Sequence, residues 1–305
     1  MKKIYTRARI VLTLLVTTII AAPVSAALNV LTCEPEWAAL TQELAGDLAD
    51  VSSATTGAQD PHHVQARPSL LSKARKADLL ICTGAELEIG WLPLLQQKTG
   101  NPAILDGADG YFMASDSVSM LDIPGALDRS QGDVHAMGNP HIQTDPNNIT
   151  KVAAALNRRL QVVDPDNADN YEQRYQDFSQ RWKQALQRWN KQAQKLRGKR
   201  IVVHHKSWVY MNEWLGLKQV GTLEPKPGIP PTTEHLGELL KQMQSNPADA
   251  IIYAAYQSPR SAHWMSERAG IKVVKLPFTV GGMEGVDNLF ELYDETLRLL
   301  DEAMQ

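Results

Sequence analysis

The segment NADNYEQRYQDFSQRWKQALQRWNKQAQKLR, residues 167–197, decides the fold because it predicts a single helix of unusual length. Its large apolar side chains return at steps of three, four or seven, which places them on one face of a helix. About 30 residues at roughly 1.5 Å each give a rod of about 45 Å, long enough to run the height of two domains. We interpret this face as core packing rather than as a ligand site. Its members are Tyr171, Tyr175, Phe178, Trp182, Leu186, Trp189 and Leu196.

On both sides of this segment, short apolar runs alternate with longer amphipathic stretches, a pattern typical of parallel strands joined by crossover helices. It predicts an α/β fold with two lobes, each a mainly parallel sheet flanked by helices. We place the lobes at residues 27–166 and 198–305 and the linking spine helix at 167–197. We expect strands at 28–33, 78–83, 200–204, 219–223, 248–253 and 271–276, and helices at 36–45, 68–77, 87–98 and 288–304.

The N-terminus has the order of a secretory signal peptide: a basic stretch, an apolar run from Ile10 to Ala22, and small residues at Val24 and Ala26. The apolar run is shorter than the roughly 20 residues needed to span a bilayer. We therefore expect a signal peptide at residues 1–26, cleavage after Ala26 and export to the periplasm.

The charge balance restricts the partners of the mature chain. The sequence has 31 basic and 34 acidic residues and a formal net charge of −3. Without basic runs in the mature chain, this balance argues against a nucleic-acid partner. We expect a monomer.

The two cysteines, Cys33 and Cys82, close two strands that should lie side by side. A strand spacing of about 4.8 Å is compatible with the Cα separation of a disulfide, and an oxidising compartment would let the pair form. Two buried thiols or a metal-binding role are the alternatives.

The histidines point to a metal site. Five of the eight lie in three short segments, DPHH at 60–63, GNPH at 138–141 and VVHHKSW at 202–208. A neutral imidazole is a strong ligand for zinc and similar ions. Ligands from distant segments can converge because the crevice of an open α/β sheet lies beyond the carboxyl ends of its strands. One histidine alone is more often a core or surface residue, but three such segments together predict a divalent metal site.

These segments resemble the signature segments of the zinc and manganese solute-binding proteins of ABC importers. The likeness rests on DPH at 60–62, GNPH at 138–141 and HKSW at 205–208, and it continues in GAELE at 84–88 and EPKPGIP at 224–230. The resemblance implies a metal held in the cleft between an N-terminal and a C-terminal metal-binding lobe, and its delivery to a permease in the inner membrane.

The resemblance also implies the ligands. His62 and His141 would bind the metal from the first lobe and His205 from the second. His63 and His204 would face elsewhere, because neighbouring side chains in extended chain point opposite ways.

The sequence departs from the family pattern at the fourth ligand. Many members have an aspartate where this chain has Leu276, and relatives often have a glutamate where it has Ala254 or Ala255. Without an oxygen ligand, three imidazoles favour zinc over manganese. The candidates for the fourth position are water, which we rank first, His135, His63 and Glu224.

Two other functions fit some of these features. Three histidines with an open fourth position also describe the catalytic site of a zinc hydrolase or lyase, but the sequence has no His-Glu-x-x-His helix or other compact catalytic motif. A metal store or surface adhesin is the other alternative. Residues 107–138 are rich in Gly, Asp and Ser, and we expect a long surface loop there.

Overall fold

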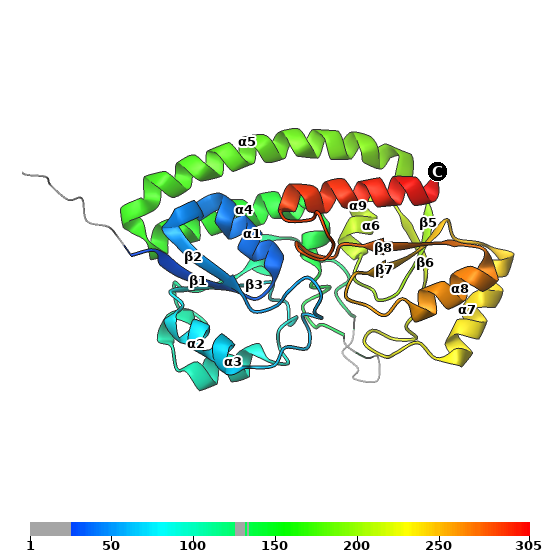
Figure 1. The fold of residues 1–305 in the computed structure, drawn as a ribbon, viewed down its shortest axis with the longest axis horizontal. Helices are drawn as coiled ribbons and strands as arrows, with labels where there is room; N and C mark the ends of the chain where they lie inside the picture. The colour runs from blue at the N-terminus through cyan, green and yellow to red at the C-terminus, as the bar shows by residue number, and fades with distance from the viewer. Residues whose placement is uncertain (1–25, 126–131, 133) are drawn as a thin grey trace, which may run out of the picture.

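The computed structural model describes residues 26–125, 132 and 134–305, which form two lobes side by side (Figure 1). Each lobe contains a four-stranded sheet in which all strand pairs are parallel. This arrangement confirms the predicted α/β fold with two lobes and a spine helix. The expected signal peptide, apart from Ala26, lies outside the described residues. Among the described residues, no helix combines the length and the apolar content needed to cross a bilayer.

The N-terminal lobe contains strands β1 (Leu28–Thr32), β2 (Ala49–Ser53), β3 (Leu79–Cys82) and β4 (Tyr111–Met113) and helices α1 (Pro35–Ala45), α2 (Pro68–Lys76) and α3 (Leu92–Thr99). The strand order is β2-β1-β3-β4. All four residues of β3 are buried, as expected for an apolar strand in a parallel sheet that helices cover on both faces. Because β1 and β3 are parallel, their C-terminal ends lie at the same edge of the sheet.

The C-terminal lobe repeats this plan with strands β5 (Arg200–Val203), β6 (Lys218–Thr222), β7 (Ala250–Ala254) and β8 (Lys272–Leu276) and helices α6 (Val209–Leu215), α7 (Thr233–Ser245), α8 (Arg260–Ala269) and α9 (Leu289–Met304). The strand order is β6-β5-β7-β8. The central strand β7, with the sequence AIIYA, is buried along its whole length. The predicted strands of this lobe are confirmed to within two residues at each end.

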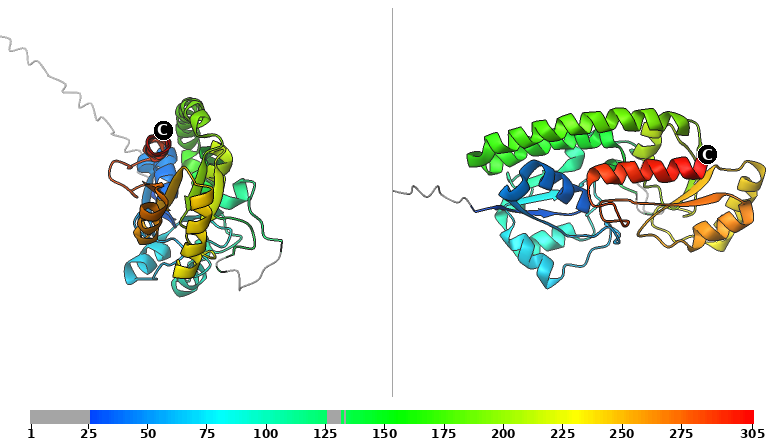
Figure 2. Two further views of the ribbon diagram at one scale, coloured as in Figure 1. Left: turned by 90° about the vertical axis from the view of Figure 1, so that its right-hand side faces the viewer. Right: turned by 45° about the horizontal axis from the view of Figure 1, so that its top comes forward.

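Helix α4 (Pro146–Val163) packs against α1 and α5, and α5 (Ala168–Ala193) joins the lobes and extends over both of them (Figures 1 and 2). The predicted aromatic face packs in the core: the ring centroid of Trp182 lies 5.2 Å from that of Phe178 and 5.0 Å from that of Trp189. The indole N–H of Trp189 donates a hydrogen bond to Asp294 of α9 (2.6 Å). The spine is thus fixed to the C-terminal lobe by apolar packing and by a polar contact.

Four details of the N-terminal lobe differ from the sequence-based expectations. Helix α4, of 18 residues, was not predicted. The strand β2 was not predicted, because its polar sequence ADVSS has no apolar run. Helix α3 begins at Leu92 rather than at residue 87, because residues 85–91 form turns and Trp91, with φ −143° and ψ −34°, lies outside the helical range. The expected loop at 107–138 contains β4 and a 3₁₀ turn (Ala114–Ser117), while its residues 126–131 and 133 lie outside the described residues.

The two cysteines form a disulfide, as the strand positions predicted. Thr32 of β1 pairs with Ile81 of β3, and Cys33 and Cys82 are the next residues along the two strands. Their Cα atoms are 4.7 Å apart. Both cysteines are completely buried. The bond excludes the alternatives of free thiols and of metal ligation by this pair in the oxidised protein.

Candidate metal centre

The structure brings together the three histidines singled out by the sequence. One ligand nitrogen from each of His62, His141 and His205 lies within 4.8 Å of the other two. The ring centroids are 5.4 to 5.8 Å apart, with the rings roughly perpendicular. His141 and His205 are buried and His62 is partly buried. These distances are those of three side chains that face one point between the lobes.

Local sequence positions each histidine. His62 lies in the turn after β2, and His205 comes two residues after the end of β5. The backbone N–H of His141 donates to the side chain of Asn139 (3.1 Å), and the amide of Asn139 donates to the carbonyl of Lys206 (2.7 Å). Asn139 therefore ties the His141 segment of the first lobe to the His205 segment of the second.

Two of the histidines are oriented by a carboxylate. His62 Nδ1 lies 2.8 Å from Asp60 Oδ1, and His205 Nδ1 lies 2.6 Å from Glu224 Oε2. Since an ionised carboxylate only accepts hydrogen bonds, each Nδ1 must carry the proton, which leaves Nε2 with its lone pair. His62 Nε2 is buried, and no group of the described residues forms a hydrogen bond with it. Carboxylate–histidine pairs of this kind fix the ring and make it a better metal ligand.

The protonation states suit metal binding. Burial, followed by the charges of neighbouring histidines, lowers the pKa of His141 well below its usual value, so this ring is neutral near pH 7. Burial alone would raise the pKa of Asp60, but the hydrogen bond and charge of His62 outweigh it and lower that pKa. The site thus presents a neutral imidazole together with an ionised orienting carboxylate, the forms that bind a cation.

Apolar side chains occupy the positions where an oxygen ligand was missing from the sequence. Leu276 and Ala254 are completely buried at the ends of β8 and β7. The ring of Phe278 lies 5.3 Å from that of His141 and also contacts Trp208 and Tyr256. Phe278 thus supports the ring of His141, and none of these residues supplies a carboxylate.

The candidates for the fourth position differ in where they lie. His135 stacks on His62 with 5.5 Å between ring centroids, and it lines a cavity of about 130 Å³ together with His141 and His205. His63 is exposed, with its ring 6.3 Å from that of His62. Glu224 is engaged by His205 Nδ1 and by the backbone N–H of Gly228 (3.0 Å). Glu224 therefore acts through His205, and His135 is the candidate side chain nearest the cavity.

The neighbouring His204 does not join the group. It is buried, and its Nε2 lies 3.8 Å from Glu224 Oε1. Within the described residues, the other cluster with metal-ligating atoms this close is Cys33, Cys82 and Glu88, whose two cysteines are joined by the disulfide. The three-histidine centre is therefore the candidate site.

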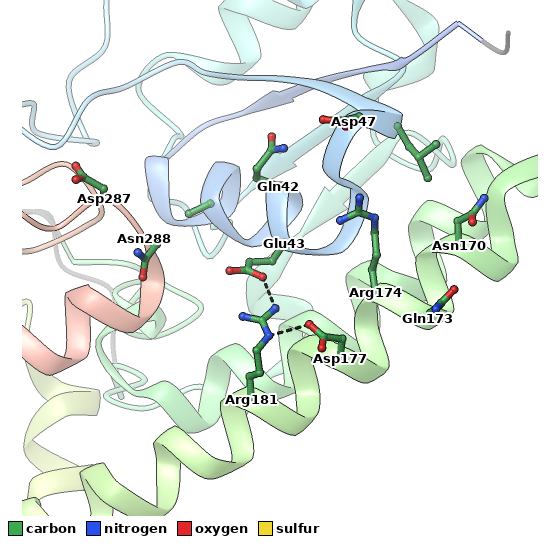
Figure 3. Close-up of a pocket in the computed structure, with 12 residues that line it drawn as sticks. Gln42, Glu43, Asp47, Asn170, Gln173, Arg174, Asp177, Arg181, Asp287 and Asn288 are labelled. Carbon is green, nitrogen blue, oxygen red and sulfur yellow. Dashed lines mark hydrogen bonds and ion pairs between the residues drawn. The ribbon is translucent and has the colours of Figure 1, made fainter.

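A larger groove of about 780 Å³ lies between α1, α5 and the segment before α9 (Figure 3). Figure 3 shows Arg181 of α5 between Glu43 of α1 (2.6 Å) and Asp177 (2.8 Å). Such partly exposed ion pairs contribute little stability, and they engage Arg181, Glu43 and Asp177 with one another. We interpret this groove as a polar surface between helices.

The sequence model of the ZnuA family, described as zinc-uptake complex component A, periplasmic, matches residues 30–303. The chain belongs to the ZnuA family. This membership confirms the resemblance seen in the histidine segments.

Relatives of this chain are named for different metals. The manganese ABC transporter substrate-binding lipoprotein PsaA of Streptococcus pneumoniae is 23% identical over 271 residues, which cover 87% of this chain and 85% of PsaA. The zinc-binding lipoprotein AdcA of the same species is 22% identical over 291 residues, covering 90% of this chain and 56% of AdcA. Both are named as binding components, and the prediction that the chain is not an enzyme is confirmed.

Solved structures share the fold. The crystal structure of ZnuA has a TM-score of 0.75 and 21% identity, covering 90% of this chain and 99% of that one. A mutant of the laminin-binding adhesin Lmb of Streptococcus agalactiae has a TM-score of 0.74 and 22% identity, covering 92% of this chain and 100% of that one. At these identities the likeness concerns the architecture alone.

The orienting carboxylates were not predicted in that role. The sequence marks Glu224 as a candidate fourth ligand and as the first residue of EPKPGIP, and it marks Asp60 as part of a signature segment. The spacing Asp60-x-His62 is a signal that could have been used, because a residue two positions before a histidine in a turn can reach its ring. The pairing of Glu224 with His205 spans 19 residues and needed the structure.

Proposed function

We propose that this ZnuA-family protein captures a divalent transition metal, zinc in preference to manganese, and delivers it to an ABC-type importer. The ligands are His62, His141 and His205. The observation that carries this proposal is the approach of three imidazole nitrogens to within 4.8 Å of one another at a point where the lobes meet.

The preference for zinc follows from the donor set. Manganese favours oxygen ligands, whereas zinc accepts three imidazoles and a fourth light ligand in a tetrahedron. The positions that could have supplied an oxygen are Leu276 and Ala254, which are buried, or Ala255, which is partly buried, and all three are apolar. Relatives named for manganese and for zinc both exist, so the choice rests on these side chains and not on the family.

Binding begins at His62 and His141, which come from the same lobe, and recruitment of His205 then ties the second lobe to the metal. The spine helix limits the motion to a small tilt. A water molecule completes the coordination, and His135 is the protein group placed to replace it. The metal is cargo, and its release into the permease reverses these steps.

The remaining parts of the proposal concern the setting. The chain is exported with residues 1–26 as its signal peptide and acts in the periplasm as a monomer. Residues 27–166 and 198–305 form the metal-binding lobes, joined by the spine at 167–197. Its partner is the permease of an importer in the inner membrane.

The test is a titration of chelator-stripped protein with zinc, manganese, copper and nickel. We expect one zinc per chain, bound more tightly than manganese, and a large loss of affinity in His62→Ala, His141→Ala and His205→Ala. His204→Ala and His63→Ala are matched controls that should bind zinc almost normally. Equal affinities in the two groups of variants would contradict the proposal.

A further inference from the structure

A buried hydrogen bond joins the two lobes beside the metal centre. The side-chain hydroxyl of Thr279, in the loop after β8, donates to the carboxyl group of Glu36 in α1. The two residues are 243 positions apart, and both are buried, with 1% of Glu36 and 6% of Thr279 exposed. This contact therefore connects the N-terminal helix of one lobe to the end of the sheet of the other.

The backbone of the loop after β8 also packs closely against the backbone of the N-terminal lobe. A Cβ atom on Gly57 would lie 2.3 Å from the backbone nitrogen of Gly282, which is closer than any real side chain tolerates. Gly57 lies five residues before His62, in the segment that carries this histidine. We call this contact of Glu36, Gly57, Thr279 and Gly282 the interlobe seam.

The seam continues directly into the metal centre. Phe278 precedes Thr279, and its ring meets that of His141 edge to face at 5.3 Å. Phe278 is 3% exposed and is also in ring contact with Trp208 and Tyr256. A displacement of Thr279 would therefore move the ring that supports His141.

Burying the carboxyl group of Glu36 costs free energy of desolvation unless hydrogen bonds compensate for it. Burial raises the pKa of Glu36 to about 7, an effect that the hydrogen bond from Thr279 opposes and the charge of Glu88 adds to. An apolar side chain in its place would avoid the cost of desolvating a carboxyl group. The contact with Thr279 gives the carboxyl group a specific role at the seam.

We propose that Thr279 and Glu36 are positioning residues of the metal centre, whose hydrogen bond holds the lobes together beside His141 and so slows release of the metal. This inference rests on the proposed function, since it requires a metal at the three histidines. It adds that the rate of release is set partly by groups that do not touch the metal.

Two substitutions at Thr279 distinguish the effect of its hydroxyl group from the effect of its side-chain volume. Thr279→Val removes the donor and keeps the volume, and we expect zinc to dissociate about tenfold faster, the effect of losing one buried hydrogen bond. Thr279→Ser keeps the donor, and Glu36→Gln keeps an acceptor oxygen. Both variants should release zinc at close to the wild-type rate.

The experiment measures zinc release by stopped flow into excess chelator, at a temperature where all variants are folded. Thr296→Val is the matched control, because it removes a buried threonine hydroxyl that donates to Leu292 within α9 (2.7 Å), away from the site. It should lower the unfolding midpoint without changing the release rate. Faster release in Thr279→Val alone would support the proposal.

Two results would overturn the inference while leaving the proposed function intact. One is a wild-type protein that binds zinc and a Thr279→Val variant that releases it no faster. The other is a Thr279→Ser variant that releases zinc as fast as Thr279→Val. A wild-type chain that takes up no zinc would instead overturn the proposed function, and this inference with it.

Discussion

Removing the carboxylate from His205 should weaken zinc binding more than removing the carboxylate from His62. Glu224 Oε2 lies 2.6 Å from His205 Nδ1 and its side chain is 13% exposed, whereas Asp60 Oδ1 lies 2.8 Å from His62 Nδ1 with 39% of the side chain exposed. Each carboxylate also accepts one backbone N–H, so that contact does not distinguish the two sites. The difference in burial should therefore decide the order.

The magnitudes follow from the degree of solvent screening. Loss of a group that orients a metal ligand typically costs about 10- to 100-fold in affinity. Water screens the more exposed pair, so Asp60→Ala should fall near the lower end, at about tenfold, and Glu224→Ala near the upper end, at about 100-fold. Asp60→Asn and Glu224→Gln keep an oxygen that accepts from Nδ1–H, and they should lose less than the alanine variants.

The assay is competition for zinc between the chelator-stripped protein and a chromophoric chelator of known affinity, near neutral pH. Circular dichroism of each variant confirms that it is folded. The reasoning would be refuted if Asp60→Ala lost as much affinity as Glu224→Ala, or if neither substitution changed zinc binding.

Four further predictions concern protons and the disulfide. Zinc affinity should fall between about pH 7 and about pH 5, because protons compete for the imidazoles; an affinity flat over this range would contradict histidine ligation. In the zinc-free protein, the pKa of His141 is lower in the folded than in the unfolded chain, so protons bind His141 more readily in the unfolded chain. The contribution of His141 to the free energy of unfolding is therefore present above about pH 6.5 and is lost below it. Urea unfolding of wild type and of His141→Gln at several pH values can check this. The pKa of Glu36 is raised from 4.5 to about 7, so its stabilising protonated form is lost as the pH rises through 7. Glu36→Gln should exceed wild type in stability at about pH 8, by at most about 3 kcal/mol, and the difference should vanish near pH 4; a constant difference would contradict this sign. Replacing Cys33 and Cys82 by serine opens a loop of 49 residues and should cost about 4 kcal/mol on the loop-entropy model, measured by urea unfolding of both proteins; an unchanged midpoint would contradict it.

The sequence predicted the elements whose side chains show a regular period. Helix α5 was predicted almost to its ends, because its aromatic face repeats over 26 residues without a break. The strand β2 was missed because an edge strand with the sequence ADVSS buries few side chains. The start of α3 was misplaced because residues 85–91 form turns, with a φ of −143° at Trp91, although the apolar residues there fit a helical period. Period and composition do not distinguish these turns from the first turn of a helix.

The same distinction holds at the metal centre. The three histidines could be predicted because each lies in a short segment with its own signature. The role of Glu224 could not, because it depends on a distance of 2.6 Å to a ring 19 residues away. The contact of Glu36 with Thr279 joins residues 243 positions apart and has no local signal at all. Groups that act through other groups are visible only in three dimensions.

X-ray absorption at the zinc edge of the zinc-loaded protein tests the central claim most directly, because it reports the atoms bound to the metal. We predict three imidazole nitrogens at about 2.0 to 2.1 Å and one further oxygen or nitrogen. In His205→Ala, one imidazole contribution should be lost. A shell dominated by oxygen, or one that is unchanged in His205→Ala, would contradict ligation by the three histidines.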